Sequence, residues 1–185
     1  MAKLASKVYG DALFQVAVEQ QMTDQLAQDA GEIRKLVLSE KELDHVMEYP
    51  GISRHEKTEL IKKILDGQVS KEMLAFLQTV LEKDRYGEID QMLDYFEKRV
   101  KEYKKIGVVF ISTPMELNEE QKKQIEDKIL QTSRYKSLEC HYRIEPELIG
   151  GVVIRMNDRV IDSSLKTQMA QLSKNLLRLQ IGKKV

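Results

Sequence analysis

The spacing of apolar residues in this chain changes once, near residue 106, and this change constrains the fold more than any other feature. Before it, apolar residues recur every three or four positions, which places them on one face of a helix. After it, residues 107–111 form a compact β-prone run, and residues 138–145 alternate strictly between apolar and polar, as in a half-buried strand. The sequence therefore predicts two domains, a helical one at 1–105 and an α/β one at 106–185.

Capping signals divide the N-terminal region into six helices with short connections. Ser39 with Glu42, and Ser53 with Glu56, have the spacing of capping boxes, in which each side chain satisfies a backbone N–H of the other residue. Ser70 opens a further helix. Since each helix has one apolar stripe to bury, we expect a six-helix bundle, with a third short helix around residues 43–47.

The C-terminal region predicts a small α/β domain with a short mixed sheet and two helices. Asn118, followed three residues later by Gln121, indicates the start of the first helix. Asn157-Asp158 predicts a two-residue hairpin turn between two short strands, because both residue types tolerate positive φ. Asp162 or Ser163 is expected to cap the last helix, whose apolar residues we expect to complete this domain.

Composition limits the possible partners and compartments. The 30 basic and 30 acidic residues leave a formal net charge of zero, so a sequence-independent attraction to nucleic acid has little support. The single cysteine, Cys140, forms no intramolecular disulfide, and the N-terminus lacks the apolar core of a signal peptide, which favours a reducing, cytosolic compartment. No apolar run approaches the roughly 20 residues that cross a bilayer, so we expect no direct membrane insertion.

No set of residues predicts catalysis, a cofactor or a metal site. The three histidines, His45, His55 and His141, are far apart in the sequence and lack neighbouring cysteines or carboxylates at ligand spacing. Gly150-Gly151 leads into a strand and lacks the lysine of a phosphate-binding loop, so a structural bulge or close packing explains it better. Binding is therefore the function that we expect.

Two surfaces carry more apolar residues than one helix interface needs. A groove between the first and fifth helices is a candidate site for an amphipathic partner helix. The simpler alternative is that all of these residues belong to the core. The last helix raises the same question near the C-terminus. The candidate residues are Tyr9, Ala12 and Leu13 on the first helix, Phe76, Thr79 and Val80 on the fifth, and Leu176, Leu177 and Leu179 on the last.

Four stretches, in order along nearly the whole chain, resemble the delta subunit of F-type ATP synthase, the bacterial relative of the mitochondrial oligomycin-sensitivity-conferring protein. YGDALFQVAVE, Tyr9 to Glu19, is similar to the first-helix motif of that family, and LEKDRYGEIDQMLDYF, Leu81 to Phe96, to its fifth-to-sixth helix junction. VFISTPMELNEEQ, Val109 to Gln121, resembles its interdomain strand and helix start. The most specific likeness is ELIGGVVIRMNDRVIDSSL, Glu147 to Leu165, which resembles the C-terminal signature.

The resemblance implies a non-catalytic stator subunit, peripheral on the cytoplasmic side of the cell membrane, that couples proton-driven rotation to ATP synthesis. It implies that the N-terminal domain binds the N-terminal helices of alpha subunits in the catalytic head, through Tyr9, Ala12, Phe76, Thr79 and Val80. It also implies that the C-terminal domain binds the b subunits of the peripheral stalk, with Gly150, Gly151 and the last helix supporting that contact.

Two other classes of function stay open at this point. A helical adaptor associated with a nucleic-acid or ribosomal complex would need a basic face that the neutral total conceals. A small α/β enzyme would need a pocket at the double glycine. Retention on heparin would indicate the first, and thermal stabilisation by nucleotides would indicate the second.

Overall fold

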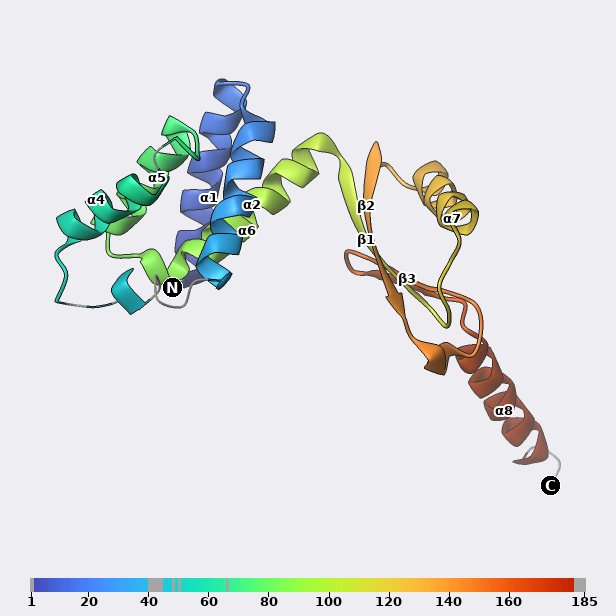
Figure 1. The fold of residues 1–185 in the computed structure, drawn as a ribbon. Helices are drawn as coiled ribbons and strands as arrows, with labels where there is room; N and C mark the ends of the chain where they lie inside the picture. Colours follow the sequence, from blue (N-terminus) through green and yellow to red (C-terminus); the bar gives the residue numbers. More distant parts are fainter. Residues whose placement is uncertain (1, 40–44, 48, 50, 66, 182–185) are drawn as a thin grey trace. The chain divides into compact units, whose positions relative to one another are not determined.

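The chain forms two compact units, one helical and one built on a mixed sheet (Figure 1). The computed structural model describes residues 2–39, 45–47, 49, 51–65 and 67–181. The first unit spans Met1–Tyr103 and the second Lys104–Val185. The expected change from helical to α/β architecture is therefore present.

All regular structure among the described residues of the first unit is helical. Its helix starts at Ser53 and Ser70 agree with prediction: Ser53 and Glu56 exchange the hydrogen bonds of a capping box, and the Ser70 side chain accepts from the Met73 N–H. The Ser39–Glu42 box and part of the expected third helix fall on residues 40–44, outside the described residues, so a total of six helices stays a prediction. The helices are α1 (Ala2–Glu19), α2 (Thr23–Ser39), α4 (Arg54–Leu65), α5 (Lys71–Glu82), the 3₁₀ turn η1 (Tyr86–Glu88) and α6 (Ile89–Lys104).

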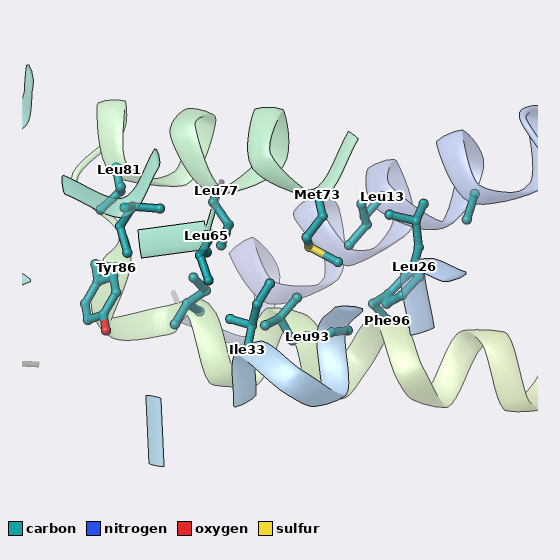
Figure 2. Packing of buried hydrophobic residues seen from close by; sticks show 14 of the residues in the cluster. Leu13, Leu26, Ile33, Leu65, Met73, Leu77, Leu81, Tyr86, Leu93 and Phe96 are labelled. Carbon is teal, nitrogen blue, oxygen red and sulfur yellow. The ribbon is translucent and has the colours of Figure 1, made fainter. Parts of the chain in front are cut away.

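One apolar cluster joins all five of these long helices. Phe96 and Leu93 of α6 are completely buried in it, and Figure 2 shows them facing residues of α1 and α2. Burying a large apolar side chain stabilises a fold by about 1.5–3 kcal/mol, so these residues dominate the stability of the unit. The cluster also includes Leu13, Leu26, Ile33, Met47, Leu65, Met73, Leu77 and Leu81.

A buried carboxylate fixes the start of α5 against α2. Asp29 Oδ2 accepts hydrogen bonds from both the backbone N–H and the hydroxyl of Ser70, the residue that caps α5. A negative charge at a helix N-terminus is favourable, and hydrogen bonds to a buried charged group are stronger than neutral ones. The side chain of Asp29 therefore contributes to the position of α5 as well as to its capping.

The second unit is a four-stranded sheet in the order β2-β1-β3-β4. β1 (Ile106–Thr113) pairs in parallel with β2 (Ser137–Ile144) and antiparallel with β3 (Val153–Met156), which forms a hairpin with β4 (Arg159–Asp162). The parallel pair is joined by α7 (Glu119–Thr132), which begins at the predicted capping box of Asn118 and Gln121. The expected short mixed sheet is confirmed.

Helix α7 covers one face of this sheet. Ile125 and Ile129 of α7 pack against Val109 and Ile111 of β1, which are fully buried. Cys140 of β2 lies on the same apolar face, as its alternating pattern predicted. The core of the second unit therefore lies between α7 and the sheet.

The start of the last helix, α8 (Leu165–Ile181), corrects the predicted cap. Ser164, not Asp162 or Ser163, caps it: Ser164 Oγ accepts from the N–H of Thr167 and is completely buried. Asp162 stabilises the same helix start in another way: its carboxylate accepts hydrogen bonds from the Ser164 N–H and from the Thr167 hydroxyl. These hydrogen bonds, first those from Ser164, lower the pKa of Asp162 below its usual range.

Replacing Asp29 by alanine tests the α2–α5 contact. We expect Asp29→Ala to lower the free energy of unfolding of the helical unit by about 2 kcal/mol, because Ser70 loses the acceptor of two hydrogen bonds. Urea denaturation of the full chain, followed by circular dichroism, measures this. Glu32→Ala, an exposed change on the same helix, serves as the control and should cost less than about 0.5 kcal/mol. Equal losses for both would contradict the role of Asp29.

Candidate partner-binding surfaces

The helical unit exposes apolar residues on α1, and a pair of aromatic rings joins α1 to α5. Leu4 and Val8 are 70% and 59% exposed, although both belong to the apolar stripe of α1. Tyr9 and Phe76 lie between the helices, half-buried, with their rings edge to face and their centroids 6.5 Å apart. We call this surface the α1/α5 face; its residues are Leu4, Val8, Tyr9, Ala12, Phe76 and Thr79.

The floor of the α1/α5 face is a small cluster separate from the main core. It contains Ala5 of α1, Val80 of α5 and Met92 of α6, with Tyr9 and Phe76 packed on it. Because Val80 and Met92 are fully enclosed, the two aromatic rings rest on a rigid base. The outer surfaces of both rings are thereby held in fixed positions.

The structure separates the six residues predicted to bind on these helices into two groups. Tyr9 and Phe76 are half-buried and in contact, and Ala12 and Thr79 are exposed, so these four reach the surface; their role in binding stays a prediction. Leu13 and Val80 do not reach the surface, because Leu13 belongs to the main core and Val80 to the floor of the face. Their side chains support the surface from below and cannot touch a partner without repacking.

The double glycine has a structural role in the second unit. Gly151 has φ +77°, and a Cβ there would lie 2.2 Å from the backbone oxygen of Ser163. A Cβ on Gly150 would meet the Leu165 side chain at 2.6 Å, while the Gly150 carbonyl accepts from the Leu165 N–H. Both glycines thus allow the chain to pass closely under the start of α8, and neither has a side chain to offer a partner.

The second unit exposes its own apolar surface along α8. Leu165, Met169, Leu172 and Leu176 recur at intervals of four, three and four residues and are 44–63% exposed. We call these four residues the α8 stripe. The sequence led us to expect that the last helix completes this unit and left open whether its apolar residues are core or surface; the structure leaves these four exposed. Beside the stripe, Ile149 is also exposed and holds φ +66°, which β-branched residues rarely adopt.

Of the three last-helix residues predicted from the sequence, only Leu176 has a described side chain, and it is exposed. The side chains of Leu177 and Leu179 lie outside the described residues. Leu4, Val8, Leu165, Met169 and Leu172 were missed as surface residues. Their spacing was visible in the sequence, but apolar periodicity alone does not distinguish a core stripe from an exposed one.

The ionisable groups of the second unit give no sign of reactivity. Burial, together with the charge of Glu126, raises the pKa of Cys140 to about 11, so its thiol stays protonated at neutral pH. The Tyr142 hydroxyl donates to Glu126 at 2.8 Å, and its pKa is also raised, first by burial. Across the described residues, no group of three or more histidine, cysteine and acidic side chains is placed to hold a metal ion.

Each unit therefore presents exposed apolar side chains, which is typical of a subunit that binds other proteins. Among the described helices, none has the length and apolarity to cross a membrane. The fold and its surfaces define an interaction protein made of two units.

Comparisons with known proteins identify the family. The family model described as "ATP synthase delta (OSCP) subunit" matches residues 5–176. The chain is 40% identical to ATP synthase subunit delta of Lachnoclostridium phytofermentans over 98% of this chain and 100% of that protein. It is 30% identical to the protein of the same name from Alkaliphilus metalliredigens, over 97% of this chain and 99% of that one. The chain belongs to the ATP synthase delta (OSCP) subunit family.

A solved structure supports the same fold. A chain in the cryo-EM structure of the Toxoplasma gondii mitochondrial ATP synthase hexamer superposes with a TM-score of 0.69, at 18% identity, over 93% of this chain and 97% of that one. The protein is thus a structural, non-catalytic component of the peripheral stalk of F-type ATP synthase, as the resemblance of its sequence motifs implied.

The role of Gly151 can be tested by comparison with Gly67, which has a similar positive φ but no atom close to its Cβ position. We expect Gly151→Ala to lower the free energy of unfolding of the second unit by more than 2 kcal/mol, because its Cβ would collide with backbone. Gly67 has φ +73° and open space around its Cβ position. Gly67→Ala should therefore lower the free energy of unfolding only by the cost of placing alanine at a positive φ, about 1–2 kcal/mol. Thermal melting of both variants measures the difference. A Gly151→Ala protein as stable as wild type would refute the close approach.

Proposed function

We propose that this subunit ties the catalytic head of the synthase to its peripheral stalk through two separate surfaces. The α1/α5 face binds the N-terminal helices of alpha subunits, and the C-terminal unit binds the b subunits through the α8 stripe. The complex places the subunit on the cytoplasmic side of the cell membrane, held there by its partners. The observation that carries this proposal is the presence of one exposed apolar surface on each unit.

The form of the α1/α5 face suits an amphipathic helix. It combines two half-buried rings, one on each of two neighbouring helices, with the aliphatic side chains of α1, and an amphipathic helix binds such a surface through residues at intervals of three and four. Aromatic residues in packed surroundings are the usual anchors of interfaces. Tyr9 and Phe76 are therefore the expected anchors, with Val8 and Ala12 around them.

The organisation of the helical unit belongs to the same proposal. Five long helices and Met47 share one core, and residues 45–47 are helical, which supports a bundle of six helices. Such a bundle is a rigid platform for a docked helix, since a close-packed interior transmits load with little deformation.

The α8 stripe has the spacing of a helix that packs on another helix. Its intervals of four, three and four match the a and d positions of a coiled-coil seam. Complete burial of a side chain of this size contributes about 1.5–3 kcal/mol, so covering four of them supplies several kcal/mol of attachment. The stalk contact is therefore assigned to Leu165, Met169, Leu172 and Leu176, and the double glycine only positions their helix.

Two modest interfaces on one chain are sufficient for a mechanical tie. Rotation in the synthase exerts a counter-torque on the head, and the tie must survive each turnover. Nanomolar attachment corresponds to about 12 kcal/mol. Once one unit is bound, the effective concentration of the other rises, so the bridge outlasts either contact alone.

A charged substitution at Tyr9 tests the head contact. We expect Tyr9→Asp to raise the Kd for a synthetic alpha-subunit N-terminal peptide at least about 10-fold, because a carboxylate replaces an interfacial ring. Isothermal titration of the full chain measures the Kd, and circular dichroism checks the fold. Tyr9→Phe keeps the ring and its packing on Phe76, and should bind within about twofold of wild type. Unchanged affinity in the aspartate variant would remove Tyr9 from the site.

A parallel substitution tests the stalk contact. We expect Leu172→Asp to weaken binding of a peptide from the C-terminal end of the b subunit at least about 10-fold, while the melting temperature stays close to wild type, since Leu172 is already exposed. Gln171→Asp adds the same charge to another exposed position of α8, away from the stripe, and is the matched control. If both variants bind like wild type, the stripe is not the stalk site.

A further inference from the structure

Helix α7 covers its face of the sheet unevenly. Two of its side chains lie over Tyr142 of β2: the Lys122 ammonium is 5.5 Å from the centre of the tyrosine ring, and Glu126 accepts a hydrogen bond from the tyrosine hydroxyl. Ile125 and Ile129 pack with residues of β1. The helix therefore lies over β2 and β1, which form one half of the sheet.

The strand pairing continues the apolar side of the sheet beyond α7. Ile111 of β1 is paired with Ile154 of β3, which is paired in turn with Ile161 of β4. Exposure rises along this row with distance from α7, because Ile111 is fully buried, Ile154 is half-buried and Ile161 is 60% exposed. The half of the sheet away from α7 therefore keeps an apolar surface that is only partly covered.

The neighbouring row repeats this gradient. Val109 of β1 is fully buried, its partner Met156 is half-buried, and Arg159, opposite Met156 on β4, is exposed. Within the described residues, α7 is the only helix that contributes side chains to the apolar cluster of this unit. We call the partly covered surface the β3/β4 shelf; its residues are Ile154, Met156, Arg159 and Ile161.

The β3/β4 shelf has the width of one helix. Neighbouring strands are about 4.8 Å apart, so the outer strands of a four-stranded sheet lie about 15 Å apart. An α-helix with its side chains is about 10 Å across and covers about two strands. Since α7 occupies the place over β2 and β1, the place beside it over β3 and β4 fits one more helix. α8 leaves it open, because the apolar residues of the α8 stripe are themselves exposed.

The flank of α7 beside the shelf carries a lysine. Lys128 follows Glu126 by two residues, which is about 200° around a helix, so the two side chains lie on opposite flanks. Because Glu126 lies over β2, Lys128 lies toward β3. The acidic residues of α7 lie on its other sides: Glu119, paired with Lys122, and Glu126 toward β2, and Glu120 and Asp127 opposite the isoleucines, away from the sheet.

The outer border of the shelf has charges of both signs. Arg159 of β4 is exposed, and Asp158 precedes it in the hairpin turn, so the charge there is partly balanced. The basic character of the shelf therefore comes mainly from Lys128, on the α7 side. A partner with an acidic residue at the edge of its apolar surface suits this arrangement.

The shelf adjoins the α8 stripe. Beyond Ile161, the Ser163 N–H donates to the Val152 carbonyl at 3.0 Å, which extends the pairing of β3 and β4 by one step. Val152 belongs to the apolar cluster of the sheet, and Leu165, the first residue of the stripe, follows Ser163 by two residues. The two exposed apolar surfaces of this unit therefore meet at the start of α8.

We propose that the β3/β4 shelf is a second binding surface for the peripheral stalk. An amphipathic helix of a b subunit packs on Ile154, Met156 and Ile161 beside α7, with an acidic residue at the edge of its apolar stripe toward Lys128. This helix completes the helical layer that the chain alone leaves half-covered. The inference rests on the proposed binding of b subunits by the C-terminal unit, and it adds a surface on the sheet to the α8 stripe.

Adjacent residues of β4 provide a matched test, because they point to opposite sides of the sheet. Ile161 and Val160 are 60% and 59% exposed, and only Ile161 belongs to the shelf. We expect Ile161→Asp to raise the Kd of the full chain for a peptide from the C-terminal end of the b subunit at least about 10-fold, and Val160→Asp to leave it within about twofold. Isothermal titration measures the Kd, and thermal melting checks that both variants are folded.

The possible outcomes separate the shelf from the stalk contact as a whole. Equal Kd values for Ile161→Asp and wild type, with Leu172→Asp weakened, would overturn the shelf and leave the α8 stripe as the stalk site. A wild-type chain that does not bind the peptide would refute the proposed stalk contact itself.

Methyl signals of the wild-type full chain provide a readout that needs no variant. On addition of the b-subunit peptide, the methyl groups of Ile154, Met156 and Ile161 should shift more than those of Val160, which lies on the other side of the sheet. Shifts confined to the α8 stripe, or equal shifts on both sides of the sheet, would overturn the shelf as a binding surface.

Charge reversal on α7 tests the acidic edge of the partner. We expect Lys128→Glu to raise the Kd for the same peptide about threefold at low ionic strength, with a smaller effect at high salt. Lys123→Glu makes the same change at an exposed position of α7 away from the shelf and should leave the Kd within about twofold. Equal effects of the two variants, or an effect that salt does not change, would contradict the pairing of Lys128 with an acidic residue.

Discussion

Burial of the apolar side of α6 holds the other helices of the first unit in position. Met92, Leu93 and Phe96 are completely enclosed, and they face different neighbours: Phe96 and Leu93 belong to the main core, while Met92 belongs to the floor under Tyr9 and Phe76. Because α6 supports both clusters, α1 and α5 are held together from below. The aromatic residues between them, Tyr9 and Phe76, are left half-buried at the surface.

The second unit also exposes apolar residues, although different contacts hold them in place. Its sheet is closed on one face by α7, whose isoleucines cover the central strand. The last helix is attached at its first turn, through the Ser164 cap, the Asp162 hydrogen bonds and the close passage of Gly150 and Gly151. Figure 1 shows α8 extending away from the sheet beyond that turn. The helix therefore has a fixed origin and an uncovered apolar stripe, as expected of an element that packs against a partner.

The sequence was sufficient where the structure follows from local chemistry. Helix starts at Ser53, Ser70 and Asn118, the Asn157 turn and the strand pattern around Cys140 all depend on neighbouring residues, and the structure agrees with each. The family was also evident, since its most specific stretch combines a double glycine, a turn and a helix start in fixed order.

The sequence was insufficient where burial depends on distant neighbours. Leu13 and Tyr9 both lie on the apolar side of α1, and only the packing of the other helices decides that Leu13 is enclosed in the main core and Tyr9 is not. The α8 stripe has the same spacing as the apolar side of a core helix. Its sequence alone therefore does not reveal that these residues are exposed in the described part of the chain. The sequence could not single out Ser164 as the cap, because Asp162, Ser163 and Ser164 all carry side chains that can cap a helix; only the structure shows that Ser164 Oγ accepts from the Thr167 N–H.

The proposed function requires that one chain binds two partners at once, through its two units. The most direct measurement is gel filtration of the catalytic head, freed of this subunit, with the soluble part of the b subunits, in the absence and presence of the full chain. The account predicts that the b subunits elute with the head only when the chain is added. If the chain binds the head and the b subunits separately but never carries both in one peak, the two surfaces are not used together, and the account of the subunit as a tie is wrong.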